Sequence, residues 1–229
     1  GFETDKDSAY HFDATKFGLW LKDHYCKPKG VKHILEDIET IEQDEDGIVS
    51  LNKKHKADLY IDCTGWKSML LGGALKVPFQ PIQNLPNNKA WATRMPYTDK
   101  EKQMRPFTNC TALENGWSWN IPLWSRMGTG YVHCDKFVDK ETALKEFKTH
   151  LKKTWGGDVE SLEYRYIDMR CGIHERLFEK NVVAIGLSAG FIEPLESNGL
   201  FSVHEFLVSL ARNIRRGEIT QWDRDNHTF

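Results

Sequence analysis

The segment at residues 186–199 carries the residues best suited to chemistry, because it combines glycines, carboxylates and hydroxyls. A long apolar helical pattern follows it at once, so the backbone N–H groups of Asn198 and Gly199 would stand at a helix N-terminus. Such N–H groups, aided by the helix dipole, can bind an anion. Alternatively, Ser197 or Asn198 is only a helix cap, and the glycines only turn the chain.

Glu196 comes just before those amides. A carboxylate held near a pocket can act as a base or balance the charge of a cation, although many such glutamates are ordinary surface or cap residues.

Two tryptophans stand two residues apart in the stretch Gly-Trp-Ser-Trp-Asn-Ile-Pro at residues 116–122. Trp117 and Trp119 would therefore share one face of a strand and could form a bulky wall beside a pocket. The alternative is core packing, which is common for paired aromatic residues.

Two short apolar strands, at residues 57–63 and 181–186, would position this chemistry. Each leads into glycine, a pattern typical of buried strands whose carboxyl ends approach a ligand. Thr64 and Gly65 would form such a turn after the first strand. The helix expected at residues 200–214, ended by Gly217, would be largely buried.

The remaining patterns predict further elements on either side of these strands. A helix capped by Asp13 would bury a stripe of Phe17, Trp20, Leu21 and Tyr25, and Gly30 would end it. Strands at residues 31–36, 37–42 and 48–51 would form a small three-stranded sheet. An antiparallel sheet would use residues 90–94, 107–113, 117–122, 129–134 and 163–169, and a helix is expected over 139–155.

Composition narrows the classes of function. The 229 residues hold 31 Lys+Arg and 33 Asp+Glu, for a net charge of −2, which excludes a main role in coating nucleic acid or an anionic membrane. No apolar run is long enough to span a bilayer. The five cysteines are odd in number and scattered, which favours a reducing, cytoplasmic setting, and no metal site is assigned.

Taken together, these segments resemble the flavin-dependent halogenases. Residues 116–122 match the W-x-W-x-I-P signature, and Phe-Ile-Glu-Pro-Leu-Glu-Ser-Asn-Gly at 191–199 is similar to a loop of the tryptophan-halogenase branch. The segments Tyr-His-Phe-Asp at 10–13 and Asp-Leu-Tyr-Ile-Asp-Cys-Thr-Gly at 58–65 are also similar to that branch. The resemblance extends from about residue 8 to 216.

The resemblance implies an α/β fold: part of a Rossmann-like FAD-binding domain of the flavin monooxygenase type, with a layered antiparallel β-sheet. Residues 1–88 and 171–229 would belong to the FAD-binding domain, and residues 89–170 to the substrate-side layer. The enzyme would use FADH2, O2 and halide to halogenate an electron-rich tryptophan, indole or phenol through hypohalous acid. A separate flavin reductase would supply FADH2, and a homo-oligomer is possible.

The resemblance also implies roles for particular residues. Glu196 would be catalytic, beside the family's lysine and the substrate. The halide would bind at Ser197, Asn198 and Gly199, chiefly through backbone amides. The FAD contacts would be Ile38, Thr64, Gly65, Gly186, Leu187, Gly190 and Leu200. The partition between substrate and flavin would be formed by Trp117, Trp119, Ile121 and Pro122.

The chain also departs from the family pattern. Asn198 stands where threonine is usual, which could shift the halide preference. The G-x-G-x-x-G turn and the catalytic lysine of the family should lie upstream of residue 1, so Gly1 is interpreted as a cut into a larger enzyme. Two alternatives stay open: an FAD-dependent aromatic monooxygenase and a non-catalytic flavoprotein remnant.

Overall fold

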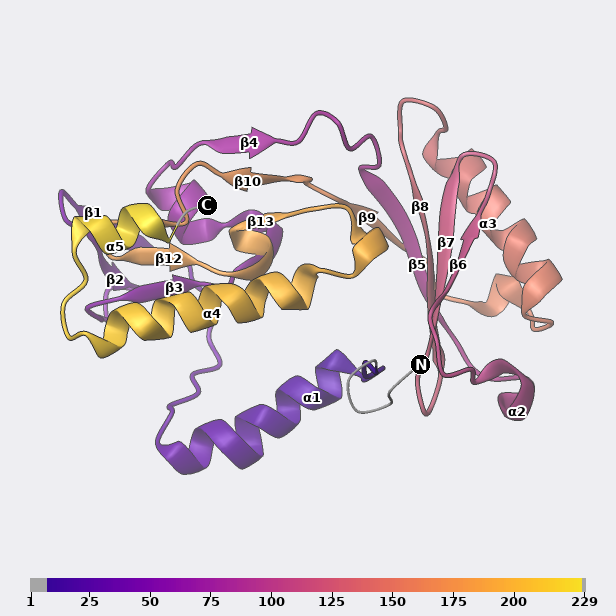
Figure 1. Cartoon of the computed structure of the whole chain (residues 1–229), viewed down its shortest axis with the longest axis horizontal. Coiled ribbons are helices and arrows are strands. Elements are labelled where there is room, and N and C mark those ends of the chain that lie inside the picture. The colour runs from indigo at the N-terminus through magenta and orange to yellow at the C-terminus, as the bar shows by residue number, and fades with distance from the viewer. Residues whose placement is uncertain (1–7, 228–229) are drawn as a thin grey trace. The chain divides into compact units, whose positions relative to one another are not determined.

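The computed structural model describes residues 8–227, apart from the side chain of Glu196, and it divides into two compact units (Figure 1). The first unit comprises the described part of Gly1–Leu35 together with Asn87–Asp168, and the second comprises Glu36–Pro86 with the described part of Met169–Phe229. The segment before Glu36 therefore groups with the large antiparallel sheet. No helix within the described residues is both long and apolar enough to cross a membrane.

An antiparallel sheet of five strands is the centre of the first unit (Figure 1). Its spatial order is β6 (Asn109–Ala112), β7 (Gly116–Pro122), β8 (Met127–His133), β5 (Lys89–Met95) and β9 (Arg165–Asp168). All five strands were predicted, and each begins within two residues of its predicted start.

Helix α3 (Lys140–Thr154) packs on one face of this sheet. Its predicted apolar face is confirmed, because Ala143, Phe147 and Leu151 have no exposed surface. Phe147 stacks on Tyr131 of β8 with ring centroids 6.0 Å apart. The N-cap is Asp139, whose side chain accepts from the N–H of Thr142.

The first helix begins as predicted but does not bury its apolar stripe. Asp13 caps α1 (Ala14–Trp20), which continues as a π-helix over Leu21–Cys26 and a 3-10 turn over Lys27–Lys29, ending at the left-handed Gly30. Phe17, Trp20 and Tyr25 are each about half exposed. The prediction of a buried stripe is therefore wrong. Within the described residues, no other element covers these rings.

Two parallel strands form the centre of the second unit. β3 (Tyr60–Asp62) pairs with β12 (Val182–Ala184), and β11 (Phe178–Glu179) adds to β12 in the antiparallel sense. Val182, Val183 and Ala184 are completely buried, which confirms the prediction of a strand covered on both faces.

Helix α4 (Gly199–Arg215) belongs to the same unit, but it is less buried than its sequence suggested. Phe206 and Leu210 are buried, whereas Leu200, Phe201 and Leu207 are 46–66% exposed. The prediction of a largely buried helix is therefore corrected to a helix with one buried face.

The predicted small three-stranded sheet is a two-stranded hairpin, β1 (Ile41–Asp44) with β2 (Gly47–Leu51). Residues 31–40 form no strand, and the side chain of Asn52 binds the backbone of the last part of this segment. It accepts from the N–H of Glu39 and Thr40 at 2.8 and 3.2 Å and donates to the carbonyl of Asp37 at 2.7 Å. A side chain thus replaces the strand partner.

The second sheet of this unit was not predicted. It consists of β4 (Phe79–Pro81), β10 (Gly172–His174) and β13 (Gly190–Phe191), with β10 in the middle. The other elements are short: α2 (Lys100–Gln103), α5 (Gln221–Asn226), a π-helix at Met69–Ala74, and 3-10 turns at Gly65–Lys67, Val159–Ser161, Gly186–Ser188 and Pro194–Glu196.

Candidate functional site

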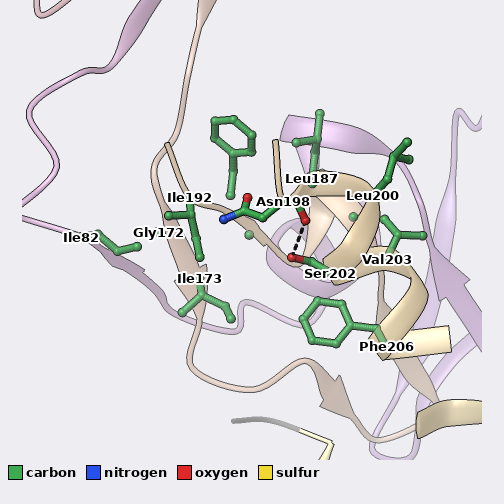
Figure 2. A pocket seen from close by; sticks show the side chains of 14 residues that line it. Ile82, Gly172, Ile173, Leu187, Ile192, Asn198, Leu200, Ser202, Val203 and Phe206 are labelled. Atoms are coloured by element: carbon green, nitrogen blue, oxygen red, sulfur yellow. Dashed lines mark hydrogen bonds between the residues drawn. The ribbon is translucent and has the colours of Figure 1, made fainter. Parts of the chain in front are cut away.

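A cavity of about 400 Å³ lies within the second unit, between the start of α4 and the β4–β10–β13 sheet (Figure 2). Its lining is almost entirely glycine and apolar side chains, with Asn198 and Ser202 as the polar members. The complete lining is Ile82, Gly172, Ile173, Gly186, Leu187, Gly190, Phe191, Ile192, Asn198, Gly199, Leu200, Ser202, Val203 and Phe206. Its volume and lining are typical of a small-molecule site.

The turn after β12 forms one edge of the cavity. Gly186 has a φ of +72°, a conformation that favours glycine, and it opens a 3-10 turn that includes Leu187. The buried Ser188 anchors this turn, because its hydroxyl donates to the carbonyls of Asp62 and Ile185. The turn is thereby tied to the end of β3, so both parallel strands fix its position.

The start of α4 forms the opposite edge. The 3-10 turn Pro194–Glu196 leads to Ser197, which is left-handed at φ +52° and donates its N–H to the carbonyl of Pro194. Asn198 is the N-cap residue, but its side chain makes no capping hydrogen bond. Figure 2 shows its carboxamide toward the cavity, with the Asn198 carbonyl bound by the Ser202 hydroxyl at 3.0 Å.

Because the first N–H groups of a helix have no intrahelical acceptor, Gly199 presents an available donor at this edge. An added Cβ at Gly199 would meet nothing within 4 Å, so the backbone there is open to approach. No lining side chain is ionisable. An anion in this cavity would therefore be stabilised by backbone N–H groups, the helix dipole and the amide of Asn198.

Strand β10 and Ile82, the residue after β4, supply an apolar wall that was not predicted. Gly172 and Ile173 reach the cavity through strand pairing, in which Gly172 lies opposite Phe191 and Ile173 opposite Gly190. Ile82 directly follows β4 and donates its N–H to the carbonyl of Cys171 at 3.2 Å. An added Cβ at Gly190 would lie 2.5 Å from the carbonyl oxygen of Gly172. The close approach of β10 therefore requires glycine at position 190. No local sequence pattern could have predicted that β10 pairs with β13.

Burial controls the ionisable groups next to the cavity. It raises the pKa of the Cys171 thiol, and the nearby charge of Glu193 raises it further. Burial also lowers the pKa of His174, as does the charge of Arg170, against an opposing hydrogen bond from the imidazole to the carbonyl of Val77. Both shifts favour the uncharged form of the group.

Several predicted residues lie outside the cavity lining. Thr64 and Gly65 form the turn after β3, where the Thr64 hydroxyl donates to the Asp62 carboxylate at 2.7 Å and accepts from the N–H of Met69 at 2.7 Å. Thr64 therefore has an evident role in holding the turn. Ile38 is half-buried in the stretch before β1, and Ser197 is exposed. The side chain of Glu196 lies outside the described residues.

The two tryptophans lie in the first unit, on β7. Trp117 and Trp119 are half-buried, with ring centroids 6.0 Å apart and planes inclined by 56°. Ser118, between them, is buried and pairs with Tyr131, which faces α3. The indoles therefore share the face of the sheet opposite α3. Ile121 and Pro122 complete the strand, and Pro122 accepts a hydrogen bond from His11 at 3.0 Å.

The sequence as a whole matches a family of known proteins. The sequence model described as tryptophan halogenase matches residues 2–227. This chain belongs to the tryptophan halogenase family. The predicted resemblance is thereby confirmed.

Individual members of the tryptophan halogenase family agree with this assignment. The chain is 38% identical over 216 residues to tryptophan 6-halogenase SttH of Streptomyces toxytricini, covering 92% of this chain and 40% of that protein. It is 36% identical to 7-chloro-L-tryptophan 6-halogenase KtzR of Kutzneria sp. strain 744, covering 95% and 42%. The chain thus spans well under half the length of these relatives.

Solved structures of the family confirm the predicted fold class. The apo structure of VirX1 superposes with a TM-score of 0.91 at 43% identity, covering 99% of this chain and 45% of that one. The crystal structure of SttH gives a TM-score of 0.87 at 35% identity, covering 95% and 45%. The chain therefore has the α/β and antiparallel-sheet architecture of a halogenase.

Proposed function

We propose that this chain is the central part of a flavin-dependent halogenase that uses FADH2, O2 and halide to halogenate an electron-rich aromatic compound. The observation that carries this proposal is the cavity at the start of α4, which brings Gly186, Leu187, Gly190, Asn198, Gly199 and Leu200 together. A free helix N-terminus beside an apolar, ring-sized space suits an anion next to a flat cofactor.

The residues present fit the ring portion of a flavin. Leu187 and Leu200 offer apolar side chains on the two edges of the cavity, and the open backbone at Gly199 allows close approach. Bound reduced FAD would supply the chemistry that activates oxygen. Within this proposal Thr64, Gly65 and Ile38 act farther along the cofactor, with the Thr64 turn fixed by the Asp62 carboxylate.

The chain's own contribution to catalysis would be binding and exclusion. The N–H groups of Asn198 and Gly199 would hold chloride or bromide, with Ser197 setting the turn that presents them. Glu196 would orient or charge-balance the lysine supplied by the rest of the enzyme. The face formed by Trp117 and Trp119 would keep the organic substrate away from the flavin, as a bulky wall can.

We further propose tryptophan or a related indole as the substrate, because SttH and KtzR are named as halogenases acting on tryptophan or chlorotryptophan. The remaining parts of the proposal are a separate flavin reductase as a transient partner and the assignment of residues 1–88 and 171–229 to FAD binding and 89–170 to the substrate side.

The decisive experiment incubates the complete protein with a flavin reductase, NADH, FAD, bromide or chloride, and a panel of indoles and phenols, and reads the products by mass. We expect a product whose mass and isotope pattern change when bromide replaces chloride. A hydroxylated product that does not depend on halide would instead establish an aromatic monooxygenase. Flavin oxidation with no modified product from any compound of the panel would contradict the proposal.

A further inference from the structure

Trp117 and Trp119 together are called the indole wall. The ring of Trp119 fills the space that a side chain at Gly130, on the neighbouring strand, would occupy. Trp119 of β7 pairs with Gly130 of β8 in the antiparallel register. A Cβ built at Gly130 would lie 2.0 Å from Cη2, 2.2 Å from Cζ2 and 2.7 Å from Cζ3 of Trp119. The six-membered ring of the indole therefore rests directly on the backbone of Gly130.

The other indole has a different cross-strand neighbour. Trp117 pairs with Val132, whose side chain is completely buried. A branched side chain thus lies opposite Trp117, whereas bare backbone lies opposite Trp119. The two rings consequently sit against β8 in different ways, and their planes are inclined by 56°.

The backbone itself does not call for glycine at position 130. Among the described glycines, those with positive φ are at positions 30, 47, 65, 156, 172, 186 and 217, so Gly130 has a conformation open to any residue. Glycine inside a strand lowers stability by roughly 0.5–1 kcal/mol relative to alanine. The feature that excludes a side chain at position 130 is therefore the ring of Trp119.

We infer that Gly130 is a positioning residue that seats Trp119 in the indole wall and so sets the barrier between the flavin and the organic substrate. This inference rests on the proposed function of the wall. With a methyl group at 130, the ring must move by more than an ångström before its contacts become ordinary. Displacements of that size in groups that control a reaction path can reduce rates by one to two orders of magnitude.

The chain offers a matched control on the same strand and face. Gly128 lies two residues before Gly130 and pairs with Ile121, and a Cβ there would have its nearest contact at 3.6 Å, with the guanidinium of Arg126. Gly128→Ala therefore adds the same methyl group to the same strand without displacing an indole.

The test compares Gly130→Ala and Gly128→Ala in the complete enzyme with its reductase, measuring halogenated product formed per FADH2 consumed. We expect Gly130→Ala to lower this coupling ratio by about tenfold while FADH2 consumption stays within about twofold, and Gly128→Ala to keep the ratio of the parent. Equal coupling ratios in both variants and the parent, with thermal unfolding confirming folded protein, would overturn the inference.

A second measurement follows the ring itself. Near-ultraviolet circular dichroism should change in Gly130→Ala and not in Gly128→Ala, because the paired indoles interact at 6.0 Å. In a Trp119→Phe background, where the outer ring atoms are gone, Gly130→Ala should leave the coupling ratio and the spectrum unchanged. A parent enzyme that forms no halogenated product would defeat the proposed function, whereas an unchanged spectrum in Gly130→Ala would defeat only this inference.

Discussion

The buried carboxylate of Asp62 accepts a hydrogen bond at 2.9 Å from the backbone N–H of Leu70, eight residues later in the chain. The same carboxylate accepts from the N–H of Leu71 at 2.9 Å, from the N–H of Thr64 at 3.0 Å and from its hydroxyl at 2.7 Å. One side chain at the end of β3 thus organises the turn and the π-helix that follow. The main-chain carbonyl of Asp62 also accepts a hydrogen bond from the Ser188 hydroxyl, which links the end of β3 to the cavity edge.

We expect Asp62→Asn to lower the free energy of unfolding by about 3 kcal/mol, because an amide NH2 would face N–H donors and leave them unsatisfied. Urea unfolding monitored by circular dichroism would measure this. Asp44→Asn is the control, since Asp44 accepts one N–H in an exposed turn and should change stability by less than about 1 kcal/mol. Equal losses in the two variants would contradict the organising role of Asp62.

Replacing Gly199 with valine should weaken halide binding without unfolding the helix. A side chain at this open position would crowd the N–H donors, and losing one charge-assisted hydrogen bond corresponds to about a tenfold rise in the halide concentration at half-maximal rate. The measurement is the initial rate against bromide concentration. Gly18→Val, at a helical glycine with equally open surroundings, should leave that concentration unchanged. A change in FAD affinity alone would show that the anion site is misplaced.

Glu196→Gln should depress halogenation by about a hundredfold while FAD affinity changes much less, because the proposed carboxylate acts on the lysine and the substrate. Product formation and flavin titration together would measure the two effects. Glu205→Gln on α4, whose side chain is half exposed, is the control and should keep full activity. Turnover equal to the parent in Glu196→Gln would remove the catalytic role.

The stability of the first unit should depend on pH through Glu146. Burial, the largest single effect, raises the pKa of this carboxyl. Hydrogen bonds from Asn115, the Tyr131 hydroxyl and the N–H of Glu114 together outweigh it, so the pKa falls below its ordinary value of 4.5. A lowered pKa in the folded state stabilises the fold above about pH 4.5, and this contribution is lost as the pH falls through the folded value.

The corresponding measurement is urea unfolding between about pH 3 and 7 for the parent and Glu146→Gln. The variant should be less stable at pH 7 and should lose less stability on acidification. Glu163→Gln, at an exposed position on the same unit, should follow the curve of the parent. Parallel curves for Glu146→Gln and the parent would contradict this assignment.

Local patterns predicted much of the fold because the physical causes were local. Alternation and turn residues located the five strands of the large sheet, and the Asp139 cap with an apolar face located α3. Residues 37–40 were predicted as part of a strand, but their backbone binds the side chain of Asn52, which no local pattern connects to them. The buried stripe of α1 failed for a related reason, since periodicity indicates a face but does not supply its partner.

The sequence by itself determined the family, the pair of buried strands and the glycine-rich loop before α4, because these depend on residue types at short spacings. Only the tertiary structure decided which of these residues share a cavity. Gly172 and Ile173 reach the cavity through strand pairing, whereas the Thr64 hydroxyl makes its hydrogen bonds within the turn after β3. Likewise, the pattern Trp-x-Trp placed two indoles on one face, but the register of β7 with β8 put Trp119 on Gly130.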